Sequence, residues 1–550
     1  MTDFLLWATP QPLPPAIERR WSWLVPQRLG LRSSACWPAA WERRQGRTLL
    51  LVGHCRGRHS RRRSSPLDTV LSSLLDDRRS PMGLPRDWLG PIAGVWIHHH
   101  HQRYRVFRDR FGRHPLQWIP LPGGWAVTSC PQTVRSLSRG TVRPTALHSF
   151  IHRPLDTEAR DLFDDVRRLR PGEVLDLRPS APARRWRWWQ PSPRSVADPT
   201  AAMRGLLHRM GRGLGASPHI LALSSGLDSA TLGAQATTLH PQSVAYTLCD
   251  PLSTRDEGPA ARHTASFLGL RWHPFSISHH LPFARLSDLA LPLAWGPAAH
   301  PDPSWKAPWH RHLRTRYPRL PLVYGNGADE ALWSPPGAGS PRRLWRRVAH
   351  RLIPLAPRRR LRQWIAPPPP MWLQPRRWMP CHLSHAPLPT ERANALALQL
   401  WSWRWERVLR SMAAESRTHN RSIWAPFLDA EFWDLSLSMD DHQIRARQIT
   451  KGIMRRAMAR RLPDECLRRC SQGGFDAVVE RGLLAVAPIL AERWLRRSRL
   501  ASVEPQFDPS AFLRAYRAYR DTPVDPHSPH IRGSWPVWRT LSAESWLRRF

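Results

Sequence analysis

The fold is decided by residues 219–229, which read His-Ile-Leu-Ala-Leu-Ser-Ser-Gly-Leu-Asp-Ser. The first five form a short apolar run typical of a buried strand, and residues 230–238 have a helical pattern. Between them lies the hexamer 224–229, a tight turn whose backbone N–H groups and helix N-terminus suit a pyrophosphate group. Asp228 repels phosphate unless a cation lies between them, so we predict that it binds Mg²⁺. An ordinary Ser/Gly turn capped by an acid has the same pattern.

A second glycine-containing cluster follows another predicted strand, at residues 320–324. It reads Tyr324-Gly325-Asn326-Gly327-Ala328-Asp329-Glu330. A strand at 243–248 and a helix at 257–268 lie between the two clusters, and this alternation predicts a parallel sheet with covered faces. Ligands of such sheets bind at the carboxyl ends of the strands, so Asp329 is predicted to share the metal with Asp228. The alternative is a glycine turn with an acidic helix start.

The N-terminal third of the sequence indicates β-structure. Short apolar or alternating runs at 48–53, 92–97, 104–107 and 123–127 predict a sandwich of antiparallel sheets. Four consecutive histidines, residues 98–101, lie between two of these runs and are predicted to form a hairpin loop rather than a metal site. Helical patterns return at 391–415 and 448–461. The stretch 334–392 is rich in Pro, Arg and Trp and is predicted to be a partly flexible insertion.

The formal net charge of +41 would ordinarily indicate nucleic acid or an anionic membrane as partner. Lys306 and Lys451 are the only lysines, however, so 83 minus 2 leaves 81 arginines, scattered along the chain. This preference for Arg over Lys is better explained by a GC-rich genome than by a surface that binds phosphate groups. We therefore expect no nucleic-acid partner. The seven cysteines contain no CxxC pair, and no apolar run approaches about 18 residues. We expect a cytoplasmic protein with reduced thiols and no membrane span.

Five segments together resemble the asparagine synthetase superfamily. The hexamer resembles its pyrophosphate loop, and residues 324–330 resemble its G-x-G-A-D-E segment. Residues 108–116 are similar to the RDRFG-x-x-PL signature of the glutaminase-like domain, and residues 169–172 and 425–429 match two further family segments. The resemblance implies an α/β protein with two domains. An N-terminal glutaminase-like (Ntn-type) antiparallel β-sandwich would span 1–190, and an ATP-pyrophosphatase domain with a parallel sheet and added helices would span 200–550.

The resemblance also implies which residues act. The residues predicted to bind ATP are Leu223, Ser224, Ser225, Gly226, Leu227, Asp228, Ser229, Leu248, Tyr324, Gly325 and Lys451. Lys451 persists where Arg has replaced nearly every other lysine, which suits a compact ammonium on the phosphates, although a helix-surface lysine is the alternative. Tyr324 and Glu415 are both candidates for the base that deprotonates the attacking amine. The segment 469–475 has Gln472 where the family normally has Lys, so Lys451 or Arg469 is expected to compensate.

One departure from the family pattern narrows the function. Members that hydrolyse glutamine need Cys directly after the initiator Met, but position 2 is Thr. The glutaminase-like domain is therefore expected to be inactive, and the enzyme to use a ready-made amine. This resembles the β-lactam synthetases and the lasso peptide cyclases, and the Arg/Trp-rich insertion favours a peptide substrate.

We therefore predict an ATP- and Mg²⁺-dependent, AMP-forming lasso peptide cyclase. Its partners would be a precursor peptide and a leader-removing protease. A small-molecule amide synthetase of the β-lactam or asparagine type is the alternative within the superfamily. A non-catalytic scaffold that binds peptide or nucleic acid is the alternative outside it.

Overall fold

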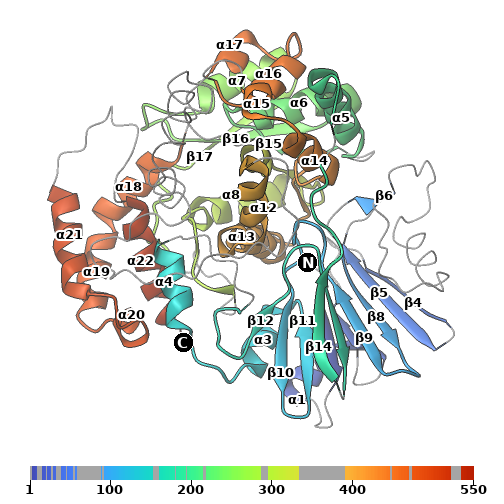
Figure 1. Ribbon diagram of the computed structural model, residues 1–550. Helices are drawn as coiled ribbons and strands as arrows, with labels where there is room; N and C mark the ends of the chain where they lie inside the picture. The colour runs from blue at the N-terminus through green and yellow to red at the C-terminus, as the bar shows by residue number, and fades with distance from the viewer. Residues whose placement is uncertain are drawn as a thin grey trace, which may run out of the picture.

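The structure is a computed structural model that describes most of the 550 residues. The residues outside the description are 1–2, 9–14, 20, 26–28, 33–38, 45, 54–55, 58–87, 90–91, 153–159, 180, 194, 215–217, 287–294, 333–390, 446–448, 470–473, 522–533 and 550. Figure 1 shows three regions: a β-sandwich at the lower right, a parallel sheet with helices above it, and a group of C-terminal helices at the left. The mixed α/β class is confirmed.

Two six-stranded antiparallel sheets form what we call the N-terminal sandwich. The order in the first sheet is β12-β10-β11-β1-β3-β2, and in the second β14-β13-β9-β8-β5-β4. The strands are β1 (Asp3–Ala8), β2 (Ser22–Val25), β3 (Leu29–Arg32), β4 (Ala39–Arg44), β5 (Arg47–Gly53), β8 (Ile92–His98), β9 (Arg103–Phe107), β10 (Gln117–Leu121), β11 (Gly124–Thr128), β12 (Arg167–Arg168), β13 (Glu173–Arg178) and β14 (Ala181–Arg187). A two-stranded sheet pairs β6 (Arg56–Gly57) with β7 (Trp88–Leu89). The four runs expected as strands lie within or overlap β5, β8, β9 and β11.

Side chains of the sandwich alternate between two faces because a strand has a period of two. In β5, Leu50 and Val52 belong to the core between the two sheets, whereas Leu49 and Leu51 join a separate cluster with Trp96. The four histidines begin at the end of β8 and continue into the turn before β9, as expected for a hairpin. This alternation is the physical reason the sequence predicts the sandwich.

The second region is built on a five-stranded parallel sheet with the order β17-β16-β15-β18-β19. Its strands are β15 (Ile220–Ala222), β16 (Val244–Cys249), β17 (Arg271–Ser276), β18 (Leu322–Val323) and β19 (Ile423–Trp424). The helices of this region are α5 (Pro199–Arg212), α6 (Leu227–Leu239), α7 (Gly258–Phe267), α8 (Pro303–Arg316), α9 (Ala328–Ala331), α12 (Glu391–Trp401), α13 (Trp403–His419), α14 (Ala430–Ser438), α15 (Asp441–Ile444), α16 (Gly452–Ala457) and α17 (Asp464–Arg468).

Both faces of the parallel sheet are covered, as the apolar strands predict. Ile220 on β15 packs with Trp309 and Leu313 of α8 in one cluster. Leu221, the next residue, belongs to the cluster on the other face, which includes residues of α5, α6 and α7. The sheet is therefore a buried platform, and its strand ends are the places where polar groups can meet a ligand.

The third region consists of C-terminal helices that pack against the sandwich. Their bounds are α18 (Asp476–Ala485), α19 (Ala487–Leu495), α20 (Arg499–Val503), α21 (Pro509–Asp521) and α22 (Ser534–Leu547). Two helices of the sandwich region, α3 (Pro131–Leu137) and α4 (Pro144–His152), contribute to the same core. The short helix α1 (Pro15–Glu18) follows β1 in the chain. Figure 1 shows α4 beside α22. Leu5 and Trp7 of β1 share this core with Trp538, so the three regions are packed together.

Two helix predictions are wrong in their bounds. The single helix expected over 391–415 is broken between α12 and α13 by Ser402, whose hydroxyl caps the new helix by accepting from the Trp405 N–H at 3.2 Å. In place of the helix expected over 448–461 the structure has only α16, Gly452–Ala457. It begins directly after Lys451, its N-cap, which has a left-handed backbone with φ +55°, and Arg460, with φ +65°, lies beyond its end. The proposed insertion, residues 334–392, lies outside the described residues except for its last two, which begin α12.

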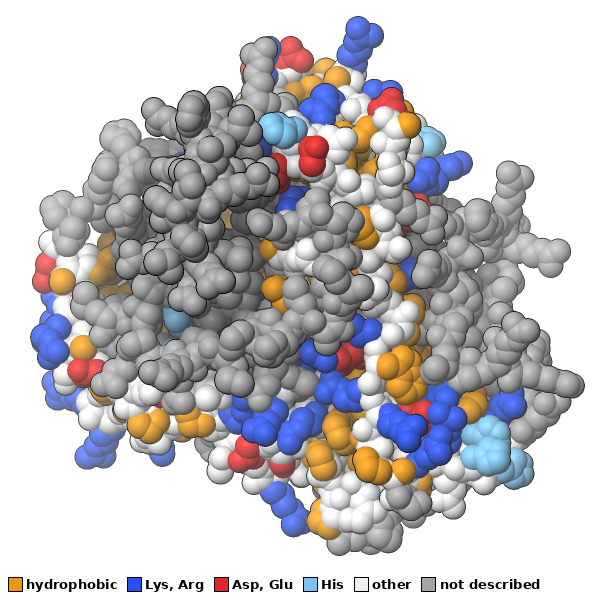
Figure 2. Space-filling model, viewed as in Figure 1, with side chains coloured by type: hydrophobic (Ala, Val, Ile, Leu, Met, Phe, Trp, Pro, Cys, Tyr) orange, Lys and Arg blue, Asp and Glu red, His pale blue; other side chains and the backbone are white. Residues whose placement is uncertain are grey.

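No helix among the described residues is both long enough and apolar enough to span a membrane. On the face drawn in Figure 2, Lys and Arg side chains lie in several separate groups with Asp and Glu among them. The described residues on that face form no single continuous basic surface.

Candidate active site

Two loops meet at the carboxyl ends of neighbouring strands. β15 and β18 pair in parallel, with Ile220 opposite Leu322, so the hexamer 224–229 and the segment 324–330 leave the sheet side by side. Gly325 is the point of contact: a Cβ there would lie 3.2 Å from the Asp228 Cβ and 3.4 Å from the Ser229 backbone nitrogen. Only a residue without a side chain allows this approach without displacing the neighbour.

Lys451 joins the acidic groups of the two loops. Its Nζ lies 2.6 Å from Oδ2 of Asp228 and 2.5 Å from Oδ1 of Asp329. Asp228 is in the first turn of α6, Asp329 is in α9, and Lys451 caps the start of α16. Three predicted site residues from distant parts of the sequence therefore lie at one point.

The charges of this cluster affect one another. Burial raises the pKa of Asp228 to about 6, although Lys451 acts in the opposite direction, and the nearby Asp329 raises it further. Burial lowers the pKa of Lys451, but the two carboxylates outweigh this effect, so the net pKa is raised and the ammonium is retained. The Lys451 ammonium thus lies between two carboxylates. They differ in exposure, because the Asp329 side chain is 60% exposed and that of Asp228 only 14% exposed.

These residues fit a Mg²⁺ ion. Oδ1 of Asp228 is buried and has no hydrogen-bond partner within the described residues, so a hard oxygen ligand is available. The described residues hold no group of three or more His, Cys, Asp or Glu that would form an all-protein metal cage. Mg²⁺ is usually held by one or two carboxylates together with substrate phosphates, and Asp228 and Asp329 supply that number.

The serines of the hexamer hold the loop in shape. The Ser229 hydroxyl accepts from the Ser224 backbone N–H at 3.0 Å and lies 2.9 Å from the Ser224 hydroxyl, which in turn accepts from the Gly226 N–H at 3.1 Å. The Ser225 hydroxyl donates to Oε1 of Glu257 at 3.4 Å. The Ser224 and Ser229 hydroxyls are therefore bonded inside the loop, and the Ser225 hydroxyl is bonded to Glu257 outside it.

Three apolar residues of the predicted ATP site lie around this loop. Leu223, directly after β15, is buried and donates its backbone N–H to the Tyr246 carbonyl at 2.9 Å. Leu227 is buried at the start of α6, and Leu248 lies near the end of the neighbouring strand β16, partly exposed. Leu223 and Leu227 belong to the buried core beneath the loop, and Leu248 is only partly buried.

A second cluster is centred on Glu415 of α13. Tyr324, directly after β18, donates its hydroxyl to Oε1 of Glu415 in a short hydrogen bond. His310 Nε2 lies 2.7 Å from the same oxygen, and Lys306 Nζ lies 3.1 Å from Oε2. Lys306 also lies 4.7 Å from the centre of the Tyr324 ring. The two candidate bases are thus a single hydrogen-bonded pair with a cation beside it.

The second cluster keeps Glu415 ionised. Burial acts to raise the pKa of Glu415, but Lys306 and the hydrogen bonds from His310 and Tyr324 outweigh it, and the pKa is strongly lowered. Burial and the adjacent Glu415 charge raise the pKa of Tyr324 well above its ordinary value, so its hydroxyl keeps the proton that it shares with Glu415. The pair therefore consists of a neutral phenol and a carboxylate.

Comparison with known proteins agrees with this geometry. A model of the asparagine synthase family matches residues 215–548, which is more than half of the chain. The chain belongs to the asparagine synthase family. This is a family of ATP-dependent amide-forming enzymes. No curated protein matches the chain.

Among solved structures, one similar to this chain is the glutamine phosphoribosylpyrophosphate (PRPP) amidotransferase from B. subtilis complexed with ADP and GMP. The identity is 12%, the match covers 43% of this chain and 47% of that chain, and the TM-score is 0.18. The chain thus spans about half the length of that structure.

Two residues of this asparagine synthase family site were missed from the sequence. Lys306 and His310 are one turn apart on α8, and both contact Glu415. The argument that singled out Lys451, its survival as lysine among 81 arginines, applies equally to Lys306 and would have found it. His310 gives no such signal, because 26 histidines are spread along the chain.

Other predicted residues are not brought to the cluster. Arg469 lies after α17, where its charge acts on Glu257: burial raises the Glu257 pKa, and the Ser225 hydrogen bond and Arg469 lower it. Arg469 is therefore near the hexamer rather than at Lys451. Gln472 and Thr2 lie outside the described residues.

Proposed function

We propose that this protein is an ATP-dependent, AMP-forming lasso peptide cyclase, which joins an Asp or Glu side chain of a precursor peptide to the peptide's N-terminal amine. The observation that carries the proposal is the adjacency of Tyr324 and Gly325. Gly325 contacts Asp228 of the ATP loop, and Tyr324 is bonded to Glu415. A nucleotide site and a proton acceptor one residue apart suit a two-step reaction at one acyl group.

In the first step, the peptide carboxylate attacks the α-phosphorus of ATP, an acyl–AMP anhydride bond forms and pyrophosphate leaves. In this proposal the N-terminus of α6 and the Lys451 ammonium, which lies beside it on Asp228, bind the phosphates. Asp228 and Asp329 would hold Mg²⁺, which supplies charge neutralisation on the phosphates when bound. Without ATP, the Lys451 ammonium pairs with both carboxylates, and its single positive charge offsets one of their two negative charges.

In the second step, the amine nitrogen attacks the acyl carbon, the C–N amide bond forms and AMP leaves. The amine must lose a proton. In this proposal Tyr324 accepts it while passing its own proton along the existing hydrogen bond to the Glu415 carboxylate, whose other contacts are with Lys306 and His310. Folding of the peptide makes ring closure an intramolecular step, so orientation supplies much of the rate.

One sequence feature supports a peptide substrate: the Arg/Trp-rich stretch 334–392. The proposal includes a leader-removing protease as partner and no nucleic acid.

The test uses purified protein, ATP, Mg²⁺ and a leader-free precursor peptide. We expect AMP, pyrophosphate and a peptide lighter by one water. Acetylating the peptide N-terminus should leave pyrophosphate exchange but prevent ring closure, and replacing the acceptor acid by its amide should prevent both. Full turnover with free aspartate and ammonia would contradict the peptide substrate and favour a small-molecule synthetase. Activity retained in an Asp228→Ala variant would favour a scaffold.

The Tyr324–Glu415 pair has its own test. Tyr324→Phe keeps the ring but removes the hydroxyl, so adenylation should continue while ring closure falls by about two to four orders of magnitude, the usual range for loss of a general base. Pyrophosphate exchange and single-turnover ring closure measure the two steps separately. Equal losses in both steps would show that the pair does not act on the amine.

A further inference from the structure

Helix α13 connects the N-terminal sandwich to the Tyr324–Glu415 pair. Glu406, Arg410 and Arg417 are separated by four and then seven residues, so they share one helix face at 3.6 residues per turn. Their contacts on that face are with the sandwich. Glu415 follows Glu406 by nine residues, about two and a half turns, and so lies on the opposite face. The orientation of α13 therefore determines where the Glu415 carboxylate lies.

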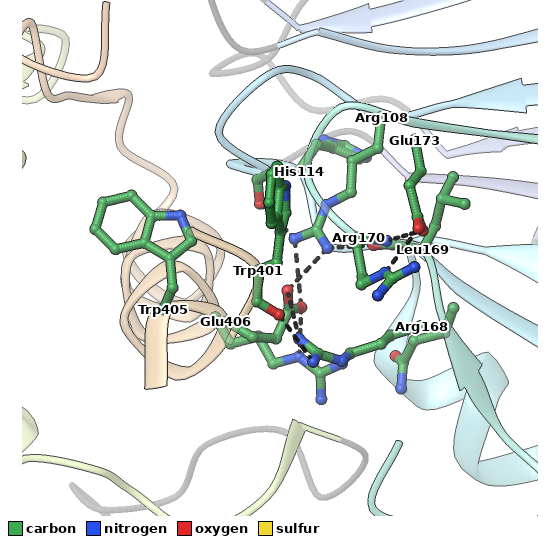
Figure 3. A network of polar contacts seen from close by, with 12 residues as sticks. Arg108, His114, Arg168, Leu169, Arg170, Glu173, Trp401, Trp405 and Glu406 are labelled. Carbon is green, nitrogen blue, oxygen red and sulfur yellow. Dashed lines mark hydrogen bonds and ion pairs between the residues drawn. The ribbon is translucent and has the colours of Figure 1, made fainter. Parts of the chain in front are cut away.

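The sandwich face of α13 is held by a buried charge network, drawn in Figure 3 around Glu406. Nη1 of Arg108 lies 2.8 Å from Oε2 of Glu406, and Nε of Arg410 lies 3.0 Å from Oε1. Arg410 forms a two-pronged pair with Asp161, with distances of 3.0 and 2.6 Å. Arg168 of β12 donates to the carbonyl of Trp401, at the end of α12. Burial acts to raise the Glu406 pKa, but Arg108, Arg410 and Arg168 lower it to about 2, so the carboxylate stays charged.

Arg417 is the point of this face nearest in sequence to Glu415, two residues away. Both of its terminal nitrogens pair with the carboxylate of Asp3 in β1. Asp3 is 1% exposed and also accepts from the Ser129 hydroxyl at 3.1 Å. The Arg417 guanidinium lies 5.3 Å from the centre of the Trp295 ring. A planar, two-pronged pair of this kind fixes orientation as well as distance.

Stability alone is a poor explanation for these charges. Replacing a buried ion pair by apolar groups is often neutral or stabilising, because desolvation of the charges offsets their attraction. What such a network does provide is a single geometry. The other side of α13 is held in the same manner, with Lys306 and His310 of α8 on Glu415.

We propose that the N-terminal sandwich acts as a brace that orients α13, and that Arg417 is a positioning residue for Glu415. This inference rests on the proposed function, in which Glu415 accepts a proton through Tyr324. The brace acts on the ring-closing step and leaves adenylation alone, because Asp228, Asp329 and Lys451 lie on α6, α9 and α16. The sandwich would thereby serve catalysis through its charged side chains.

The first test measures the resting protein and needs no substrate. The chain has six tyrosines, so tyrosine labelled with ¹³C in the ring gives few NMR signals, and Tyr324→Phe identifies that of Tyr324. We expect Arg417→Met and Asp3→Asn to shift the Tyr324 signal, and Arg417→Lys to restore it in part. The control is Arg209→Met, which removes an exposed pair with Glu431 at 3.1 Å and should leave the signal unchanged. An unchanged signal in both brace variants would overturn the proposal whatever the reaction proves to be.

The second test measures the two half-reactions with ATP, Mg²⁺ and the precursor peptide. Arg417→Met and Asp3→Asn should slow single-turnover ring closure at least tenfold and change pyrophosphate exchange by less than twofold. A purely structural role would lower both steps together, and that result would overturn the proposal. If Arg417→Met does not fold, Asp3→Asn and Arg417→Lys carry the comparison. A wild-type protein that closes no ring, but whose Tyr324 signal responds to Arg417, would reject the proposed function and keep the brace.

Discussion

Replacing Asp228 by Asn tests which of two opposing effects on the Asp228 carboxylate is larger, the cost of burying its charge or its attraction to Lys451. Burial raises its pKa from the ordinary 3.8 to about 6, against the effect of Lys451. A group whose pKa is raised by folding favours the folded state while it is protonated, so this contribution is complete below pH 3.8 and is lost as the pH rises through about 6. A shift of about 2 units, at about 1.4 kcal/mol per unit, corresponds to about 3 kcal/mol of stability lost at pH 8.

Asparagine has nearly the same shape as aspartate but carries no charge, so Asp228→Asn should avoid this loss. We expect the ATP-free variant to be more stable than the wild type at pH 8, by up to about 3 kcal/mol, and equally stable near pH 4. At about 2–4 °C per kcal/mol for a domain of 150–250 residues, the unfolding temperature should rise by several degrees. Pyrophosphate exchange should be abolished, since a Mg²⁺ ligand is lost.

The measurement is thermal unfolding of both proteins without ATP at pH 4, 6 and 8. Asp329→Asn is the matched control, because Asp329 pairs with the same lysine but its side chain is 60% exposed. Removing its charge therefore relieves little desolvation cost. Its unfolding temperature should change little at any of these pH values. A lower stability of Asp228→Asn at pH 8 would refute the reasoning, since it would mean that the ion pair with Lys451 outweighs burial.

Three other changes test further parts of the structure. Gly327 has φ +104°, and a Cβ there would lie 3.0 Å from the Phe427 backbone. Gly327→Ala should therefore unfold at a clearly lower urea concentration than Gly269→Ala, since at Gly269 φ is +65° and no atom lies within 4 Å of such a Cβ. Equal losses of stability in the two variants would contradict the packing. Lys451→Arg keeps the charge but brings a planar fork between two carboxylates, so pyrophosphate exchange should fall at least tenfold, and a normal rate would refute this role. The Glu406 pKa is lowered to about 2, so its stabilisation should be lost as pH falls from about 4.5 toward 2, and Glu406→Gln should remove that pH dependence of urea unfolding.

The sequence predicts that the segments 224–229 and 324–330 meet, because each depends on a local pattern. A strand, a glycine turn and an acid at a helix start are adjacent in the chain, and two such units must come together when their strands pair. Lys451 is singled out as a site residue by the scarcity of lysine in the chain and not by a local sequence pattern. Its left-handed backbone, which shortens α16, has no signal in the residue type, because lysine rarely adopts φ +55°.

Tyr324 and Glu415 are both predicted as candidate bases, but neither their pairing nor the brace could be predicted, because the partners are distant in sequence. Tyr324 and Glu415 are separated by 91 residues, and Arg108 and Glu406 by 298. The segment 108–116 was recognised as a motif, but its contact with α13 depends on how the sandwich packs on the second region. Ser402 has no periodic signal that distinguishes a helix cap from a polar position inside one helix, so the break before α13 was missed.

The location of both lysines has a consequence for chemical labelling. Lys451 and Lys306 carry the chain's only lysine side-chain amines, and each lies in the candidate active site, 8% and 19% exposed. An amine-selective reagent, which on most proteins modifies many surface positions, has few other lysine targets to compete for it here. An acyl-phosphate analogue of ATP would deliver its acyl group beside Lys451, and the modified peptide would report how much of the site is occupied. Because lysine is so scarce in this chain, modification of a lysine side chain reports directly on the candidate active site.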